Sequence, residues 1–443
     1  MKEPLRAPVA AAGIALLAVG LGLSQAGGTG LAVPRGGGAQ GAAPAVALSS
    51  SWSCAGATAG PGSLAAGRLS VDNAGSSSLA ASVRLVAQDG QARTVALSVA
   101  PGQQVQVPET LPGRARGEWV GALVELYGGM GSVYQKVSTR WGSSEAPCAT
   151  SASGSWYFAG GSVLRNAALE ISLVDPYPAA AVVDVSFATT EGPEQPLASQ
   201  GVVVPARGLA VLNVGALLRQ RAGVATQINA SSGRVAAFET LRVQHPPLGA
   251  PPLGTAGALN PVLEASGVAL SAGVQPSTSW WWPAAGERAG STESFQVYNP
   301  GRTPGRAVLQ LLPGGRGVSS SYSFTVPPAG FVTVKTNGQP WALPGVAYAA
   351  HISSDVPVVA ERESLGPGVS LTPGEVEAWE RWLATPAPHA VFSPSGGGVA
   401  VYGRTALSLS AGALGNLTPA PGTAPIISSS SPVFLAGPAV PLS

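Results

Sequence analysis

The sequence Ser279-Trp-Trp-Trp282 opens the clearest of several similar series of motifs in this chain. An alternating apolar segment that ends at a turn residue follows at Phe295-Gln-Val-Tyr-Asn299, and a proline-containing link lies at Val326-Pro-Pro328. The series closes with a terminal apolar segment at Val358-Val359. Repetition of such a series at similar spacing indicates an array of structural modules.

Two earlier copies of the series precede this one, and a shortened fourth copy follows it. The first opens at Ser51-Trp-Ser-Cys54 and the second at Ser155-Trp-Tyr-Phe158. Each continues with the same kinds of segment in the same order: Leu69-Ser-Val-Asp-Asn73, Val99-Ala-Pro-Gly102 and Val133-Tyr134 in the first copy, and Ile171-Ser-Leu-Val-Asp175, Val204-Pro205 and Val235-Ala-Ala-Phe238 in the second. The repetition assigns most of the chain to a structural framework.

The pattern inside each copy predicts β-strands. Apolar residues recur at every second position, as at Val83 and Leu85 and again at Val95 and Leu97, which is the period of a half-buried strand. Asp89-Gly90 between these runs is a strong hairpin signal. The first copy is therefore expected to form strands at 68–71, 81–86, 94–99, 104–107, 120–126 and 133–137.

Short strands separated by turns, with almost no helix, predict an all-β chain of tandem, immunoglobulin-like antiparallel β-sandwich modules. A β-propeller is the topological alternative. Its blades hold about four strands in about 40–50 residues. The units here are about twice as long, which favours sandwiches.

The predicted organisation follows the repeats and the composition. It consists of an N-terminal signal peptide or signal-anchor helix (1–26), a flexible linker (27–48), module 1 (49–150), module 2 (151–245), a Pro/Gly-rich connector (246–276), module 3 (277–370) and a truncated module 4 (371–443). The connector has apolar alternation of its own up to Gln275, so packing against a module is left open. Module 4 is expected to begin with a short helix at 375–383, with Trp379 and Trp382 on one face.

The N-terminus has the features of a secretory signal. Lys2 and Arg6 precede an apolar run from Val9 to Leu23, and the small residues of Ser24-Gln-Ala26 suit cleavage. An uncleaved anchor is the alternative, because the uncharged stretch continues to Val33. Either reading predicts an extracytoplasmic protein, secreted or anchored to the plasma membrane by this segment alone.

The overall charge gives little support to nucleic acid as a partner. Lys and Arg number 24 and Asp and Glu 22, so the net charge is only +2, and no block of like charge occurs. The many Ala, Gly, Pro and Val residues, with few lysines among the basic residues, favour a GC-rich bacterial source.

The two cysteines suit an oxidising compartment. Cys54 lies in the first opener, and Cys148 follows the last apolar segment of the same copy. A disulfide between them would close a loop of about 95 residues across module 1. Two unrelated thiols or a metal pair are the alternatives, although no histidine lies near either cysteine.

The Trp openers, the Asn or Asp turn and the Val-x-Pro-Ala-x-Gly link give the chain a family resemblance. It resembles uncharacterised secreted or membrane-anchored proteins of actinobacteria that share a domain of unknown function, over about residues 45 to 443. The resemblance implies a cell-envelope location and brings no established activity. Cys54 would match that family's Trp-x-Cys opener, whereas Phe158 and Trp282 replace the cysteine in the later copies.

The sequence contains no recognisable catalytic or metal-binding motif. His245, His351 and His389 are far apart in sequence, and no nucleophile motif or phosphate-binding loop is present. We therefore predict no catalytic residue, no metal and no cofactor. Glu239 and Glu361 occupy equivalent positions in their copies and are expected to be structural, because recurring residues usually serve the repeated fold. Glycosidase chemistry would need two carboxylates about 5–9 Å apart around one cleft.

Aromatic residues of the openers are the candidate ligand contacts. Trp280, Trp281 and Trp282 cannot all point into one core, because neighbours on a strand alternate faces. Trp156 and Tyr157 raise the same question. An exposed ring could stack on a sugar or anchor a protein, and packing between modules is the alternative.

We therefore expect a non-enzymatic scaffold or interaction protein of the cell envelope. The alternative is a cell-wall glycan-binding accessory protein that uses exposed Trp residues, and an unrecognised hydrolase is a less favoured reading. Cell-wall polysaccharide and envelope proteins are the partners that these readings imply.

Overall fold

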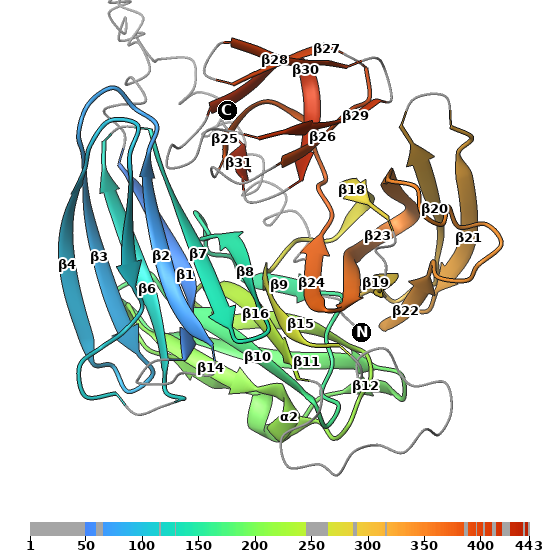
Figure 1. Cartoon of the computed structure of the whole chain (residues 1–443). Coiled ribbons are helices and arrows are strands. Elements are labelled where there is room, and N and C mark those ends of the chain that lie inside the picture. The colour runs from blue at the N-terminus through green and yellow to red at the C-terminus, as the bar shows by residue number, and fades with distance from the viewer. Residues whose placement is uncertain are drawn as a thin grey trace, which may run out of the picture. The chain divides into compact units, whose positions relative to one another are not determined.

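The computed structural model describes residues 49–58, 65–114, 117–128, 130–244, 265–286, 290–314, 317–384, 389–395, 397–401, 404–409, 413–418, 426–436 and 439–441. Residues 45–443 form one compact unit. The predicted signal or anchor (1–26), the linker (27–48) and the connector up to residue 264 lie outside the described residues. The described part is nearly all β-strand, in antiparallel sheets (Figure 1).

The range of module 1 contains two four-stranded sheets, ordered β1-β6-β3-β4 and β5-β2-β7-β8. Their strands are β1 (Ser50–Thr58), β2 (Ala66–Asn73), β3 (Leu79–Ala87), β4 (Ala92–Val99), β5 (Gln104–Pro108), β6 (Trp119–Tyr127), β7 (Gly131–Thr139) and β8 (Gly142–Pro147). Alternate apolar residues such as Leu69 and Val83 are fully buried. One hydrophobic core combines residues of both sheets.

The range of module 2 and the end of the connector form a second pair of sheets. One is ordered β12-β11-β15-β9 with β13 paired to β11, and the other β14-β10-β16-β17. The elements are β9 (Ser155–Phe158), β10 (Ala167–Val174), β11 (Ala181–Thr189), β12 (Gly192–Glu194), β13 (Val202–Val204), β14 (Leu209–Asn213), β15 (Val224–Ser232), β16 (Ala236–Val243) and β17 (Gly267–Ala272), with the helical turns η2 (Leu197–Ser199) and α2 (Val214–Leu217).

In the range of module 3 one long strand, β23 (Tyr348–Gly366), joins two groups of strands. Its first half pairs with β18 and β20, and its second half pairs with β19 and β24. The other strands are β18 (Ser277–Ala285), β19 (Thr292–Asn299), β20 (Gly305–Pro313), β21 (Ser320–Val326), β22 (Gly330–Lys335) and β24 (Gly368–Pro373). A third core lies between the two groups.

The range of module 4 has a smaller core around Val391, Ile427 and Leu435. Its strands are β25 (Trp379–Ala384), β26 (His389–Ser393), β27 (Gly397–Val401), β28 (Arg404–Leu409), β29 (Ala413–Leu417), β30 (Ile426–Ala436) and β31 (Ala439–Pro441). β30 is central because it pairs with β25, β26 and β27.

One strand order recurs in the first three ranges. It reads β5-β2-β7-β8, then β14-β10-β16-β17, then β22-β19-β23-β24. β8, β17 and β24 therefore occupy the same edge position in three sheets. β8 and β24 were not predicted from the sequence, and β17 lies within the range predicted as a connector.

The helix predicted at 375–383 is wrong. Residues 379–384 form β25, which pairs with β30, and Glu375 exchanges two backbone hydrogen bonds of 2.8 Å with Trp281. β30 and β18 provide hydrogen-bond partners for the backbone of this segment, so sheet pairing overrides the local preference for helix. The predicted helical face shared by Trp379 and Trp382 therefore does not form.

The strand registers also correct the predicted equivalence of Glu239 and Glu361. Leu69 lies opposite Gln135, Ile171 opposite Glu239 and Phe295 opposite Arg362. Glu239 therefore corresponds to Gln135 and Arg362. Glu361 is one position earlier, on the opposite face of its strand.

Candidate functional site at the junctions between modules

Two of the three adjacent opener tryptophans are core residues. Trp280 and Trp282 are 1% and 2% exposed and belong to the core of module 3. Their indole N–H groups donate to the backbone oxygens of Val358 and Thr372, each at 2.9 Å. Neither ring offers a surface to a ligand, so the exposure required of them by the glycan-binding alternative is not found.

Trp281 points to the other face of β18 and joins two modules. Its ring stacks on His351 of β23 at a centroid distance of 3.9 Å. It also stacks on Phe434 at 5.0 Å and Phe392 at 5.5 Å, both in module 4. Burial lowers the pKa of His351 to about 4, which keeps this imidazole neutral at pH 7. This stack is inter-module packing, the alternative considered for the openers.

Trp156 and Tyr157 are half-buried at the second opener. The Trp156 indole donates to the backbone oxygen of Val235 at 2.6 Å. Tyr157 exchanges two backbone hydrogen bonds of 3.1 Å with Val274, just after β17. Contact of these two residues with a ligand stays a prediction.

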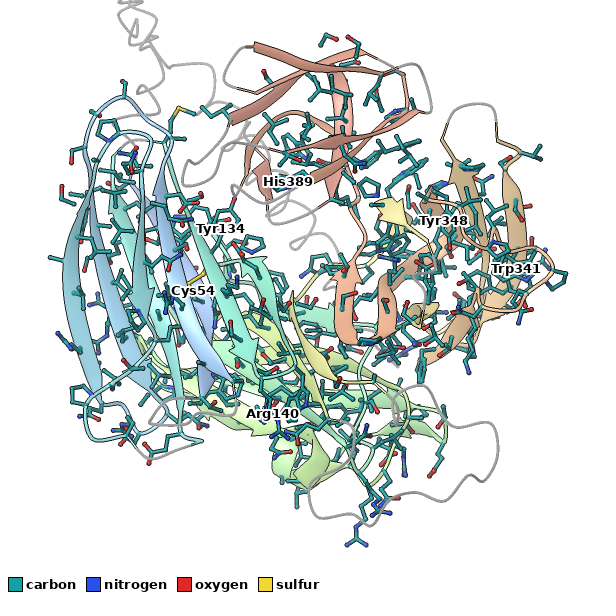
Figure 2. The ribbon with its side chains drawn as sticks, viewed as in Figure 1. Cys54, Tyr134, Arg140, Trp341, Tyr348 and His389 are labelled. Atoms are coloured by element: carbon teal, nitrogen blue, oxygen red, sulfur yellow. A yellow bond between two sulfur atoms is a disulfide. The ribbon has the colours of Figure 1, made fainter. Side chains whose placement is uncertain are left out.

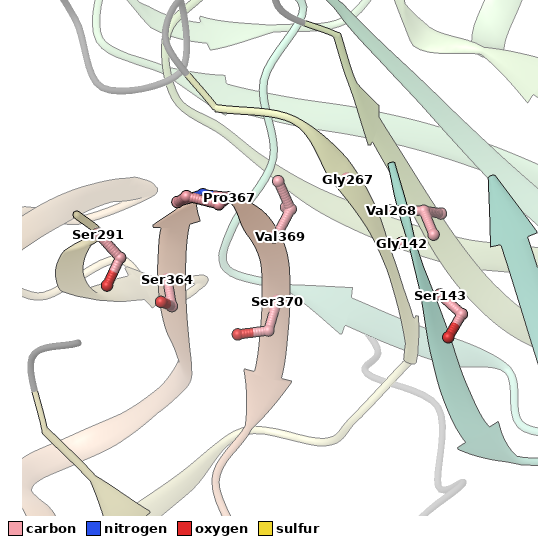
Figure 3. A pocket seen from close by; sticks show the side chains of 10 residues that line it. Gly142, Ser143, Gly267, Val268, Ser291, Ser364, Pro367, Val369 and Ser370 are labelled. Atoms are coloured by element: carbon pink, nitrogen blue, oxygen red, sulfur yellow. The ribbon is translucent and has the colours of Figure 1, made fainter. Parts of the chain in front are cut away.

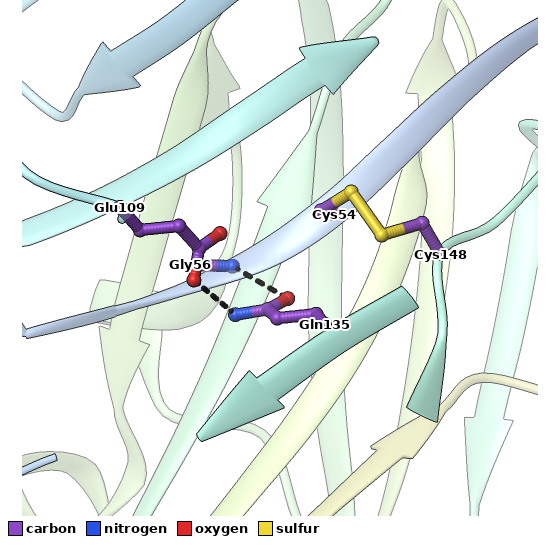
Figure 4. The surroundings of a disulfide bond; sticks show 5 residues. All are labelled: Cys54, Gly56, Glu109, Gln135 and Cys148. Atoms are coloured by element: carbon purple, nitrogen blue, oxygen red, sulfur yellow. Dashed lines mark hydrogen bonds between the residues drawn. A yellow bond between two sulfur atoms is a disulfide. The ribbon is translucent and has the colours of Figure 1, made fainter. Parts of the chain in front are cut away.

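The predicted disulfide between Cys54 and Cys148 is confirmed (Figure 4). Beside it, Gln135 accepts a hydrogen bond from the backbone N–H of Gly56 at 3.1 Å and donates to Glu109 at 2.9 Å. Glu109 is fully buried, and burial raises the pKa of its carboxyl well above the ordinary value. The disulfide joins β1 to the residue that follows β8, and Gln135 links β1 to β7 inside module 1.

Modules 1 and 2 share a hydrophobic cluster. Trp119 and Ala55 of module 1 belong to it together with Phe238 of β16 and Leu270 of β17. The backbone N–H of Leu270 also donates to the Ser144 hydroxyl on β8 at 3.0 Å. This junction is therefore mainly apolar, with β17 lying against β8.

The junction of modules 2 and 3 contains buried carboxyl groups. Glu361 of β23 accepts hydrogen bonds from the backbone N–H groups of Ala159 and Gly160, at 3.0 and 2.6 Å, and from the Ser271 hydroxyl at 3.1 Å. Its side chain is fully buried, and burial raises its pKa to about 7. One side chain of module 3 thus holds the opener of module 2 and β17 together.

Glu239 lies in the same region, on the strand that pairs with β17 opposite Ser271. It is 1% exposed, and neither of its carboxyl oxygens has a hydrogen-bond partner among the described residues. Burial raises its pKa well above the ordinary value, and the charges of Glu361 and Glu363 raise it further. Both effects favour the protonated, neutral form of Glu239.

The corresponding position in module 3 carries the opposite charge. Arg362 forms an ion pair with Glu293, which also accepts a hydrogen bond from the hydroxyl of Tyr348. Figure 2 labels Tyr348 among the strands of module 3. Glu293 and Tyr348 are almost fully buried. The three equivalent positions are therefore occupied by the amide of Gln135, the carboxyl of Glu239 and the guanidinium group of Arg362. Each of these groups has different polar neighbours.

Glu239 and Glu361 do not form a catalytic pair in contact with solvent. Glu239 and Glu361 are 1% and 0% exposed, so a substrate cannot reach them without opening the junction. Within the described ranges, no group of three or more His, Cys, Asp or Glu residues could hold a metal ion. His351 has a hydrogen-bond partner in module 3, and His389 has one in module 4.

β8, β17 and β24 meet around a cavity that the sequence analysis did not find. β17 lies against both other strands, and the cavity has a volume of about 350 Å³ (Figure 3). Its lining includes Gly142, Gly267 and Gly368, the first residues of the three strands. Each of these three short strands begins with glycine, and this is the sequence feature that could have indicated the site.

Comparison with known proteins gives one family match. A model of a family of unknown function (DUF5719) matches residues 127–250, so a domain of that family lies there. No curated protein matches the chain. A solved structure, "Crystal Structure of Thermotoga maritima 1070", is 19% identical with a TM-score of 0.21 and covers 23% of this chain and 94% of that one.

The helical elements of the described ranges are the short turns η2 and α2. None of the helices found there has the length and hydrophobicity needed to cross a bilayer.

Proposed function

We propose that this chain is a non-enzymatic scaffold of the cell envelope that holds its modules together as one body. The observation that carries the proposal is the sharing of cores across predicted boundaries. The main core of module 2 includes Leu365, Val369 and Leu371 from β23 and β24 of module 3. Domains joined by large apolar interfaces move little relative to one another, so such a chain would present its surfaces at fixed separations.

The pairs of sheets support a finer proposal about the fold. Each of the first three ranges would be an antiparallel β-sandwich of the immunoglobulin-like kind, and module 4 a shortened relative. Their recurring strand order and the position of each core between two sheets support this reading.

An extracytoplasmic location fits the covalent chemistry. Disulfides persist mainly in oxidising compartments, and the Cys54–Cys148 bond closes a long loop of the framework. The N-terminal segment, with its basic start and apolar run, would direct the chain across the membrane and either be removed or anchor it. An actinobacterial envelope is the setting that the opener motifs favour.

The non-enzymatic part of the proposal rests on where the acidic groups lie. The junction carboxyls serve as hydrogen-bond acceptors or are sealed from solvent. Hydrolysis would need an acid and a base around an accessible cleft.

The experiment that tests the scaffold role compares location, retention and turnover. Intact host cells would be treated with an external protease, and isolated envelopes would be incubated with purified full-length protein. We expect external cleavage, retention on envelopes and no release of reducing sugar. A purely cytoplasmic protein, or one that releases sugar, would contradict the proposal.

Glycan binding is a second candidate function. Trp280 and Trp282 do not support glycan binding, because both are buried. The cavity between β8, β17 and β24 favours glycan binding, because the cavity lining contains serine hydroxyls and no charged side chain. Retention on purified cell-wall polysaccharide, free of protein, would separate this candidate from a scaffold that binds envelope proteins.

A further inference from the structure

Three strands from different parts of the chain begin in the same unusual way. Gly142, Gly267 and Gly368 open β8, β17 and β24 and have φ angles of 149°, 157° and 144°. Residues with a Cβ rarely adopt this backbone conformation. All three glycines line the same cavity, so the backbone turns into the cavity wall at three equivalent positions.

Hydroxyl groups and small apolar side chains complete the wall. The remaining lining residues are Ser143, Val268, Ser291, Ser364, Pro367, Val369 and Ser370. Figure 3 shows Ser143 on the opposite side from Ser291, Ser364 and Ser370. The hydroxyls of Ser143, Ser364 and Ser370 have no hydrogen-bond partner among the residues that the structure describes.

The cavity carries no charged side chain in its lining. A charged ligand would lose hydration there without gaining a counter-charge, which is unfavourable. A ligand rich in neutral donors and acceptors would instead pair with the serine hydroxyls and place C–H groups against Val268, Val369 and Pro367. The volume of about 350 Å³ is near the lower end of the roughly 300–1,000 Å³ of ligand pockets.

An extended peptide fits this cavity less well. A peptide would have to add as a strand to a free sheet edge. β17 already lies against β24 so closely that a Cβ on Gly267 would be 2.6 Å from the backbone nitrogen of Val369. No room is left there for another strand between the two edges.

We propose that the cavity between β8, β17 and β24 binds a short stretch of an uncharged oligosaccharide. This inference rests on the second candidate function, glycan binding, and names its site and ligand class. It does not depend on the scaffold role.

The test uses titration calorimetry of the full-length protein with three neutral probes, cellotriose, maltotriose and N-acetylchitotriose. Trigalacturonate serves as the charged probe and a neutral hexapeptide as the peptide probe. Ser370→Trp and Ser143→Trp would fill the cavity from opposite sides. Ser323→Trp, on the exposed face of β21, is the matched control.

We expect saturable binding of at least one neutral trisaccharide, with at least tenfold weaker affinity in both cavity-filling variants. Affinity should be unchanged in Ser323→Trp, and all variants should keep the parental melting temperature. Ser370→Ala tests the hydroxyl without filling space and should weaken binding by less than Ser370→Trp.

Several results would overturn the inference. They are no binding of any neutral trisaccharide at millimolar concentration, a preference for trigalacturonate or the peptide, and equal weakening by Ser323→Trp. If polysaccharide retention survives both cavity-filling variants, glycan binding stands and this site fails. If the envelope experiment alone fails, the scaffold role fails and the cavity is unaffected.

Discussion

Glu239 is a buried carboxyl whose oxygens have no hydrogen-bond partner among the described residues. Burying a charge without a partner is very unfavourable, so burial raises the pKa of Glu239 and favours its neutral form. Glu361 is also buried, but its carboxyl group accepts three hydrogen bonds. Because the pKa values of both groups are raised, we expect the stability of the junction of modules 2 and 3 to depend on pH.

The sign of this sensitivity follows from the raised pKa values. Glu361 has a pKa of about 7 in the folded protein, and that of Glu239 lies well above its ordinary 4.5. Both groups contribute stability fully below about pH 4.5, and this contribution is lost as pH rises through the folded-state values. A tenfold difference in proton affinity between the folded and unfolded states corresponds to about 1.4 kcal/mol of stability.

Glu239→Gln should therefore make stability less dependent on pH. The amide is similar in shape and cannot ionise, so we expect the variant to gain about 1–3 kcal/mol over the parent at pH 8 and little at pH 5. Urea unfolding at the two pH values measures this difference. Glu377→Gln, at an exposed position, is the control, and an equal loss for Glu239→Gln at both pH values would contradict the account.

The disulfide between Cys54 and Cys148 is also expected to contribute to stability. Reduction, or the double change Cys54→Ala and Cys148→Ala, should lower the stability of module 1 by about 2–4 kcal/mol because a loop of 94 residues is no longer closed. Thermal unfolding with and without reductant measures the loss. An unchanged transition of module 1 would show that the bond adds nothing to the framework.

At the scale of elements, the sequence pattern predicted the strands with regular alternation. The six strands predicted for module 1 all form, because each presents one apolar face to a core. β8 and β24 were missed because Gly142-Ser-Ser-Glu-Ala-Pro147 and Gly368-Val-Ser-Leu-Thr-Pro373 are short segments that begin with glycine and end with proline, both of which are typical of turns. Each forms a tight hairpin with the strand directly before it, β7 or β23, and only its packing against β17 depends on a segment that is distant in sequence.

The candidate site was less predictable than the strands. Sequence alternation indicates that adjacent tryptophans face opposite ways, but it cannot tell which face meets another module. Trp281 meets module 4, whereas Trp280 and Trp282 enter their own core. The buried hydrogen bond between Glu361 and the residues after the second opener joins positions about 200 residues apart. A local sequence pattern cannot indicate a contact over that separation.

Trp281→Ala should loosen module 4. The change removes the ring between His351 and the two phenylalanines, and we expect a loss of about 2–4 kcal/mol at this contact. Faster hydrogen exchange in β26 and β30, with unchanged exchange in module 1, is the expected readout. Trp141→Ala, in module 1, is the control, and equal effects of the two changes on module 4 would contradict the assignment.

At the scale of the whole molecule, the shared cores predict that the modules are not independent. Module 2 cut at its predicted boundaries, 151–245, would lack β17 and the three apolar residues that module 3 contributes to its core. We expect this fragment to be poorly folded, with weak dispersion of its amide resonances. A well-dispersed spectrum from 151–245 would show that the module stands alone.

The most direct test of the account is native-state hydrogen exchange across a denaturant series. In the parent protein, β16 of module 2 and the second half of β23 should open together, with one free energy and one denaturant dependence. Glu361→Ala should separate the two openings, because it removes the acceptor that holds the second opener. Separate opening of β16 and β23 in the parent protein would contradict the claim that the modules form one body.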